Sequence, residues 1–210
     1  NVSEIHGLST VVSTHLAQSE DVSVKLSVAA EQVQELVSRF VIGEGELDAV
    51  IGVARHARDN LAEMLERAQG EGLNIFDQRY QPIPGSNPAK FHTAYDDKLA
   101  PALQKIYDQV VQKTNGGRFC LLVDTNGYAP THNSFYSKPL TGDLQQDLVG
   151  SRDKRIFNDP TGIKSAKNTQ PFLLQTYMRD TGEILSEIAL PIRLAGRRPA
   201  GRSAARPVPP

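Results

Sequence analysis

Two stretches of the chain decide its fold: Arg118–Asn133, RFCLLVDTNGYAPTHN, and Tyr177–Leu194, YMRDTGEILSEIALPIRL. In the first, the apolar run FCLLV ends in DTNG, and in the second, two strand-like runs are joined by DTGE. Asn-Gly and Asp-x-Gly between apolar runs indicate hairpins, because Gly and Asn tolerate the positive φ that tight turns require. Both stretches therefore predict antiparallel strands, with Gly127 and Gly182 in the turns.

A heptad pattern occupies residues 3–42, ahead of these strands. When Ile5 is taken as position a, nine of the eleven a and d positions are apolar. The two series are Ile5, Val12, Ser19, Leu26, Val33 and Phe40 at a, and Leu8, His15, Val22, Ala29 and Leu36 at d. So narrow an apolar stripe is typical of a coiled-coil seam, which predicts a homodimer or a helix folded back on its neighbour. The alternative is an amphipathic helix that lies on its own domain.

Two further helices and a connector separate the heptads from the strands. Apolar residues at spacings of three and four predict helices over 46–69 and 96–112, and Gly70 and Gly72 end the first of these. Between the two helices, residues 73–88 contain three prolines, which exclude a regular helix or an interior strand. We therefore expect an extended connector there.

The second half of the chain has the pattern of a small sheet with an insertion. Strands are expected over 119–124, 127–131, 173–179 and 184–194. The insertion, residues 134–171, is polar and rich in turn residues, with a short helix expected over 144–149. Long irregular segments of this kind are typical of binding loops.

The chain is thus predicted to have an α+β fold, with long N-terminal helices that form an antiparallel or coiled-coil arrangement before an antiparallel sheet with flanking helices. We divide it into a helical region (1–42), a linker and proline-rich connector (43–95), a sensor-like domain (96–196) and a disordered basic Arg/Pro tail (197–210).

Composition and motifs exclude several classes of protein. The formal net charge of −1 offers no general attraction to nucleic acid, and the heptads lack the basic stretch of a DNA-binding zipper. No apolar run approaches the roughly 20 residues that span a bilayer. A glycine-rich phosphate loop, G-x-S-x-G and H-E-x-x-H are all absent from the sequence, so we expect a binding protein and no enzyme. The single cysteine, Cys120, lies in an apolar run and is expected to be inert core.

Two parts of the chain resemble bacterial chemoreceptors, the methyl-accepting chemotaxis proteins. Residues 3–40 are rich in Ser, Ala, Gln and Glu, end in Val-Ser-Arg-Phe, and resemble the last adaptation helix of the signalling domain. The region from Phe119 onward resembles a PAS-like or single-Cache sensor domain. The motifs NIFDQRYQPIPGSNPAKFHTAYD, DTNGYAPTHN and SRDKRIFNDPTG resemble receptors that carry such a sensor after the signalling domain.

This resemblance implies a function in chemotaxis signal transduction. The chain would bind a small molecule, form a homodimer, and act through a chemotaxis kinase and adaptor complex on the cytoplasmic side of the inner membrane. The sequence departs from the family after Arg198, where the family continues into an apolar strand and this chain continues PAGRSAARPVPP. Proline cannot donate to a strand ladder, which places the last strand of the sheet in doubt.

Candidate ligand contacts come from the insertion and the strand ends. Arg152 and Arg155 offer planar donor forks that suit a carboxylate or phosphate, so an anionic ligand is expected. In the alternative interpretation they form surface ion pairs with Asp147, Asp153 or Asp159.

Four more residues complete the candidate site: His132, Asn133, Tyr177 and Asp180. His132-Asn133 could equally cap a turn, and Asp180 could close the DTGE turn rather than bind a ligand amine. No cofactor or metal is expected, although His92 with His132 could hold a haem or a metal ion. A structural dimerisation module that binds nothing stays open as the second interpretation.

Overall fold

The structure is a computed structural model that describes residues 2–42, 44–178 and 183–194. Within the first helix, side chains are described for residues 9, 11–30 and 33. The elements are α1 (Val2–Ile42), α2 (Glu44–Gly70), β1 (Gln81–Pro82), β2 (Phe91–His92), α3 (Asp96–Lys113), β3 (Tyr128–Ala129), the 3₁₀ helix η1 (Ser134–Tyr136), α4 (Leu144–Gly150), β4 (Arg155–Ile156), α5 (Pro160–Ala166), β5 (Leu173–Met178) and β6 (Ile184–Ala189). The fold is α+β, as the sequence predicts.

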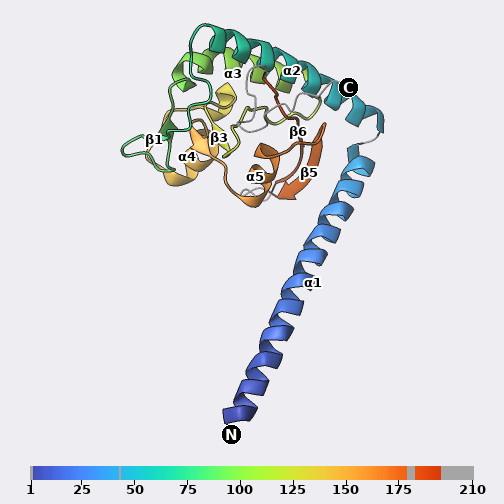
Figure 1. Cartoon of the computed structure of the whole chain (residues 1–210). Helices are drawn as coiled ribbons and strands as arrows, with labels where there is room; N and C mark the ends of the chain where they lie inside the picture. Colours follow the sequence, from blue (N-terminus) through green and yellow to red (C-terminus); the bar gives the residue numbers. More distant parts are fainter. Residues whose placement is uncertain (1, 43, 179–182, 195–210) are drawn as a thin grey trace, which may run out of the picture.

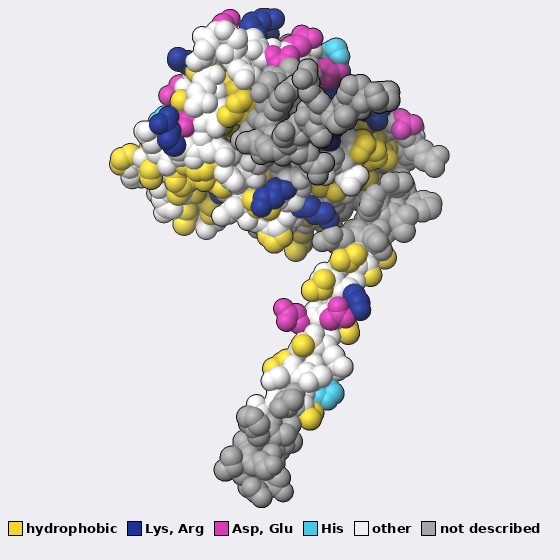
Figure 2. Space-filling view, in the orientation of Figure 1, with side chains coloured by type: hydrophobic (Ala, Val, Ile, Leu, Met, Phe, Trp, Pro, Cys, Tyr) yellow, Lys and Arg dark blue, Asp and Glu magenta, His cyan; other side chains and the backbone are white. Residues whose placement is uncertain are grey.

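The heptad region forms one helix, α1, that extends away from the rest of the molecule (Figure 1). Its C-terminal end meets α2 and β5. Apolar side chains lie exposed along this rod (Figure 2): Val12, Val22, Leu26 and Val33, at four seam positions, are 54%, 62%, 68% and 58% exposed. The helix is confirmed, whereas its self-association stays a prediction.

The core lies where α2 packs on α3, and both predicted helices are confirmed to within two residues. Leu61 and Leu65 of α2 are buried against Leu99 and Leu103 of α3, in a cluster that also contains Tyr107. Burial of each leucine contributes about 1.5–3 kcal/mol to the free energy of unfolding. The apolar spacing of three and four therefore reflects burial, since it places these side chains on the face of each helix that packs in the core.

Within the described residues, three separate two-stranded antiparallel sheets replace the single sheet that we expected from the sequence. β5 pairs with β6 from Leu173↔Ala189 to Met178↔Ile184, which confirms the second predicted hairpin. Its turn, with Gly182, lies outside the described residues. β1 pairs with β2, and β3 pairs with β4, over two residues each.

The predicted strand over 119–124 is wrong, because side chains take up the backbone donors that a neighbouring strand would use. The N–H of Cys120 donates to Asn133 Oδ1 at 2.9 Å, and the N–H of Leu122 donates to the Tyr107 hydroxyl at 2.9 Å. Only the N–H of Asp124 reaches a backbone acceptor in the next segment, the carbonyl of Tyr128, at 3.0 Å. The segment is thus held in place without joining a ladder.

The DTNG turn is confirmed. Gly127 has a φ of +83°, its N–H donates to the Asp124 carbonyl at 2.9 Å, and the Asp124 carboxylate accepts the N–H groups of Asn126 and Tyr128. Phe157 crosses directly over the turn, and its N–H donates to the Gly127 carbonyl at 2.9 Å. A Cβ on Gly127 would overlap the Phe157 carbonyl oxygen. The turn therefore needs glycine for its φ and for this close approach.

The insertion over 134–171 is more regular than expected. The short helix predicted over 144–149 is present as α4, with Asp143 accepting the N–H groups of Gln145 and Gln146. A second short helix, α5, was missed by the sequence analysis. Asp159 caps it by accepting two backbone N–H groups, and Pro160 stands in its first turn, so the start signal was present in the sequence. In the described part of the chain, no helix is long and apolar enough to cross a membrane.

Candidate functional site

A large cavity lies between α2 and the strands. Its volume is ≈ 1360 Å³, above the range of about 300–1,000 Å³ that is common for small-molecule sites. The inner face of α2 forms one wall, with Ala54, Ala57 and Leu61 among its lining residues. Residues 118–125 form a second wall, and the segment around β4, α5, β5 and β6 forms the third. The cavity therefore touches both the linker helix α2 and the predicted sensor domain.

Four of the six candidate residues line this cavity: His132, Arg152, Arg155 and Tyr177. Asn133 does not line it, because its side-chain amide is used within the fold, accepting from Cys120 and donating to Asp108 at 3.0 Å. These hydrogen bonds join segments far apart in the sequence, and the Asn133 side chain does not cap the 3₁₀ helix η1 that follows it. Asp180 lies outside the described residues.

The guanidinium groups of Arg152 and Arg155 both lie close to one aromatic ring. Their guanidinium carbons lie 5.3 Å and 5.5 Å from the centre of the Phe157 ring, within the range of cation–π attraction. The Nη1 group of each arginine also donates to the Leu148 carbonyl, at 3.1 Å and 3.4 Å. Two positive groups are therefore fixed next to each other in the cavity wall.

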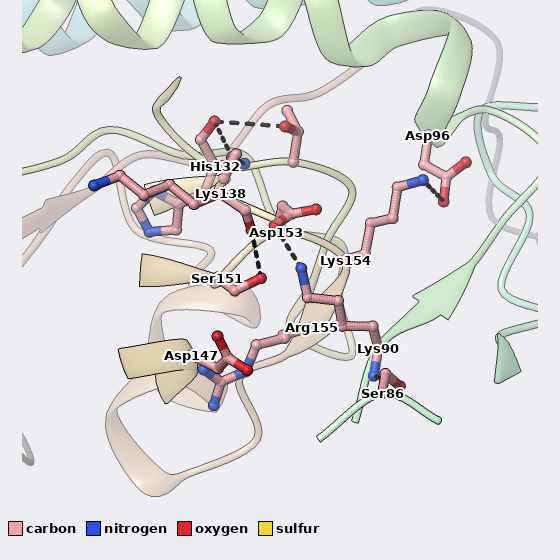
Figure 3. Close-up of polar contacts among 12 residues, drawn as sticks. Ser86, Lys90, Asp96, His132, Lys138, Asp147, Ser151, Asp153, Lys154 and Arg155 are labelled. Carbon is pink, nitrogen blue, oxygen red and sulfur yellow. Dashed lines mark hydrogen bonds and ion pairs between the residues drawn. The ribbon is translucent and has the colours of Figure 1, made fainter. Parts of the chain in front are cut away.

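Neighbouring charged residues anchor this segment from its other side (Figure 3). Lys90, 6% exposed, pairs with Asp153 at 2.7 Å, and Lys154 reaches from the segment to the start of α3. Asp153 and Lys154 are held toward β2 and α3, while Arg152 and Arg155 line the cavity.

The alternative interpretation paired the two arginines with Asp147, Asp153 or Asp159, and in the described part of the chain these three aspartates have other partners. Asp147 accepts the N–H groups of Thr141 and Gly142, Asp153 pairs with Lys90, and Asp159 caps α5. Backbone hydrogen bonds, led by the N–H of Thr141, hold the pKa of Asp147 below its ordinary value. The three aspartates thus stabilise local structure.

His132 is a buried residue of the cavity wall, 2% exposed. Its Nδ1 accepts the N–H of Asn133 at 2.8 Å, so the neutral imidazole carries its proton on Nε2. The edges of Phe119, Tyr136 and Phe157 pack around the ring, with centroid distances of 5.8 Å, 4.9 Å and 6.5 Å. This packing fixes the orientation of the imidazole.

Sequence reasoning missed a polar group on β6. Glu187 lines the cavity, where Ser165 donates to one carboxylate oxygen and the Tyr177 hydroxyl donates to the other at 3.1 Å. Burial raises the pKa of Glu187 above its ordinary value, although these hydrogen bonds oppose the shift. A signal was present in the sequence, since Glu187 shares the strand face of Leu185 and Ala189, the less exposed face of β6.

Cys120 also belongs to the cavity wall. It is half-buried, and burial raises the pKa of its thiol to about 12. The expectation that it is inert agrees with this shift, because the thiolate is the reactive form.

The two histidines proposed for a metal or haem have different surroundings. In the described part of the chain, the metal-like cluster contains His92, Asp96 and Asp97, and His132 is not part of it. The ammonium group of Lys154 lies among these three residues, 2.5 Å from Asp97 Oδ1, 3.2 Å from His92 Nδ1 and 3.9 Å from Asp96 Oδ2. The hydrogen bond from Lys154 lowers the pKa of Asp97. A lysine thus fills the position that a metal ion would take.

Comparison of the chain with protein-family models, with curated proteins and with solved structures found no match.

Proposed function

We propose that this chain is the small-molecule-sensing part of a methyl-accepting chemotaxis receptor, in which occupancy of the cavity biases the helical signalling region. The observation that carries the proposal is the shared wall: residues of α2 line the same cavity as His132, Arg155 and Tyr177. A molecule in this cavity would contact a helix that follows α1 directly in the chain.

The proposed mechanism is a shift between two arrangements of α2 and the strands. A ligand that fits one spacing of the cavity walls better than another stabilises that arrangement by the difference in binding free energy. Coupling of about 1–3 kcal/mol, typical of allosteric proteins, would change the population of the signalling state roughly five- to 150-fold. α2 would transmit this bias to α1.

The proposed partners follow from the chemoreceptor resemblance and from the surface of α1. Val12, Val22, Leu26 and Val33 lie exposed at seam positions, and a second copy of α1 would bury them in a parallel or antiparallel homodimer. We place the action of the chain on a chemotaxis kinase and adaptor complex, at the cytoplasmic side of the inner membrane.

A structural dimerisation module is the second candidate, because the exposed seam of α1 would pair whether or not the cavity binds anything. A haem or metal sensor is a weaker candidate, since Lys154 occupies the metal-like cluster. A Soret band or bound metal in the purified protein would bring this candidate forward.

The test of sensing is a thermal-shift screen against organic acids, amino acids and purines, with two matched variants of α2. Ala54→Phe places a large ring in the cavity wall, whereas Ala62→Phe makes the same change at a position of similar burial that does not line the cavity. We expect at least one compound to raise the melting temperature of the wild type and of Ala62→Phe, but not that of Ala54→Phe.

The same compound should change the monomer–dimer equilibrium in sedimentation. If no compound shifts the melting temperature, or if the shift survives Ala54→Phe, the sensing proposal fails and the structural module takes its place.

A further inference from the structure

We infer that the cavity takes a primary amine with an apolar body, whose ammonium group lies against the carboxylate of Glu187. This inference rests on the proposed function, because it names the class of molecule that the same cavity would sense. Simple amines and amino acids both carry such an ammonium group, and they differ in the carboxylate that an amino acid adds.

The carboxylate of Glu187 is held in place by two neutral groups. Ser165 of α5 donates to Oε1, and the Tyr177 hydroxyl of β5 donates to Oε2 at 3.1 Å. Gln175 of β5 fixes Ser165 in turn, because its Nε2 donates to the Ser165 Oγ at 2.7 Å and to the Thr161 carbonyl at 3.3 Å. The neighbouring elements α5, β5 and β6 (Figure 1) therefore position this carboxylate before a ligand arrives, which reduces the entropy lost on binding.

These two hydrogen bonds leave acceptor sites on the carboxylate. An ionised carboxylate offers about four lone-pair sites on its two oxygens. Among the described residues, Ser165 and Tyr177 are the two that donate to Glu187, one to each oxygen. Because Glu187 lines the cavity, a ligand can donate to the remaining sites. An ammonium group suits them, since it carries three donors and no acceptor.

The charge of Glu187 also favours a cation. Burial raises the pKa of this half-buried carboxyl, the charge of Asp159 adds to the shift, and the hydrogen bonds from Ser165 and Tyr177 oppose it. In the described part of the chain, no lysine or arginine lowers this pKa or forms an ion pair with the carboxylate. An ammonium group would supply the positive charge, and hydrogen bonds between two charged groups are about twice as strong as neutral ones.

The remaining walls indicate the rest of the molecule. Ala57 and Leu61 of α2 line the cavity together with Leu121 and Val123, so an apolar body would be covered on two sides. Sites of this kind combine apolar walls with a few placed polar groups that orient the ligand. Glu187 would be the group that orients an amine, because the hydrogen bonds described above fix its position.

A metal ion is the other cation that a carboxylate attracts. Metal sites bring several ligand atoms together, most often from His, Cys, Asp and Glu. Within the described residues, the cluster of this kind consists of His92, Asp96 and Asp97, and Glu187 is not part of it. The neighbours of the Glu187 carboxylate are two hydroxyl groups that already donate to it. The surroundings of Glu187 therefore fit an organic cation better than a metal ion.

The experiment measures binding of 2-phenylethylamine, 2-phenylethanol and phenylalanine, together with hexylamine and hexanol. Isothermal titration calorimetry at constant pH and ionic strength is carried out on the full chain and on Glu187→Gln and Glu187→Asp. Glu183→Gln is the matched control: Glu183 also lines the cavity, but it pairs with Arg118 at 3.0 Å.

We expect 2-phenylethylamine or hexylamine to bind the wild type more tightly than the alcohol with the same body. Loss of the charged hydrogen-bonding partner in Glu187→Gln should weaken binding of the amine about ten- to a hundredfold and leave binding of the alcohol nearly unchanged. Glu187→Asp should recover part of the loss, since aspartate keeps the charge on a shorter side chain. Glu183→Gln should bind like the wild type, and all variants should keep the tyrosine near-UV circular dichroism of the folded core.

Two results with the wild type alone would overturn the inference: neither amine binds, or an alcohol binds as tightly as its amine. Two results with the variants would do the same: Glu187→Gln keeps the affinity for the amine, or Glu183→Gln loses as much affinity as Glu187→Gln.

Two further outcomes separate the source of the ammonium group and the two proposals. Phenylalanine that binds more tightly than 2-phenylethylamine, and loses this affinity in Glu187→Gln, would support the ammonium site and identify an amino acid as the source. A neutral compound from the thermal-shift screen that binds and is blocked by Ala54→Phe, with no amine bound, would overturn this ligand class and leave the sensor proposal standing.

Discussion

The crossing of Phe157 over Gly127 links the stability of the fold to the candidate site, and three glycine-to-alanine variants test it. Gly127 has a φ of +83°, and a Cβ there would overlap the Phe157 carbonyl. Gly142 has a similar φ of +88°, but a Cβ there would have no neighbour within 4 Å. Gly52 lies inside α2, also with open space. The three variants thus separate backbone strain from steric overlap.

The three variants are expected to change the free energy of unfolding by different amounts, and one of them in the opposite direction. Positive φ costs an alanine about 1–2 kcal/mol, so Gly142→Ala should destabilise by about 1 kcal/mol once the lower entropy of its unfolded chain is included. In Gly127→Ala the backbone of Phe157 must also move, which weakens the 2.9 Å hydrogen bond between Phe157 and Gly127. This adds about 0.5–1.5 kcal/mol to the cost of about 1 kcal/mol for the positive φ, for a total of about 1.5–2.5 kcal/mol. Gly52→Ala should stabilise the protein by about 0.5–1 kcal/mol.

The assay is urea unfolding followed by near-UV circular dichroism of tyrosine. The buried residues Tyr95, Tyr107 and Tyr128 report on the core, and α1 contains no tyrosine, so fraying of the long helix does not enter the signal. Equal effects of Gly127→Ala and Gly142→Ala would refute the steric argument. An unchanged stability of both would refute the argument from φ as well.

Two further predictions concern the seam of α1 and the half-buried carboxylate of Glu187 on β6. The double variant Leu26→Lys, Val33→Lys should shift a dimer toward monomer in sedimentation. Val24→Lys, which changes an exposed residue outside the seam, should not. If the wild type is a dimer and the double variant keeps the same mass, the coiled-coil hypothesis is wrong. Because the pKa of Glu187 is raised in the folded state, the native protein binds more protons than the unfolded chain above pH 4.5, and stability falls as the pH rises through the folded pKa. Glu187→Gln should remove this part of the pH dependence. The difference in free energy of unfolding between the wild type and Glu187→Gln should therefore be smaller at neutral pH than at low pH, or change sign. Parallel pH profiles of the two proteins in urea unfolding would contradict the assignment.

Local patterns in the sequence predicted the elements that depend on local contacts. α2 and α3 follow from apolar spacing, and their bounds differ from the expected ones by at most two residues. The β5–β6 pair and the turn at Gly127 follow from turn chemistry. Over 119–124 the same reasoning failed, because the donors of this apolar run are taken by Tyr107 and Asn133, which an alternating pattern does not reveal.

The candidate site was predicted only in part, because some of its residues are brought together by contacts between distant segments. Residue chemistry was enough to select Arg152 and Arg155, since they are the two arginines of the insertion. The pairing of Lys90 with Asp153 joins residues 63 positions apart and needs the folded chain to be seen. The face of β6 that carries Glu187 could have been found from the alternation of the strand, but a carboxylate inside an apolar run was not expected to face a cavity.

Cys120 gives the unaltered chain a chemical reporter of its own. It is the single cysteine of the sequence and forms part of the cavity wall, and a thiol with a pKa of about 12 is almost entirely protonated at neutral pH. Alkylation should therefore be slow, and slow enough to be followed by mass spectrometry over a long time course. A fluorinated reagent attached there would place one NMR-visible nucleus beside whatever enters the cavity, so occupancy can be watched without the introduction of any other label.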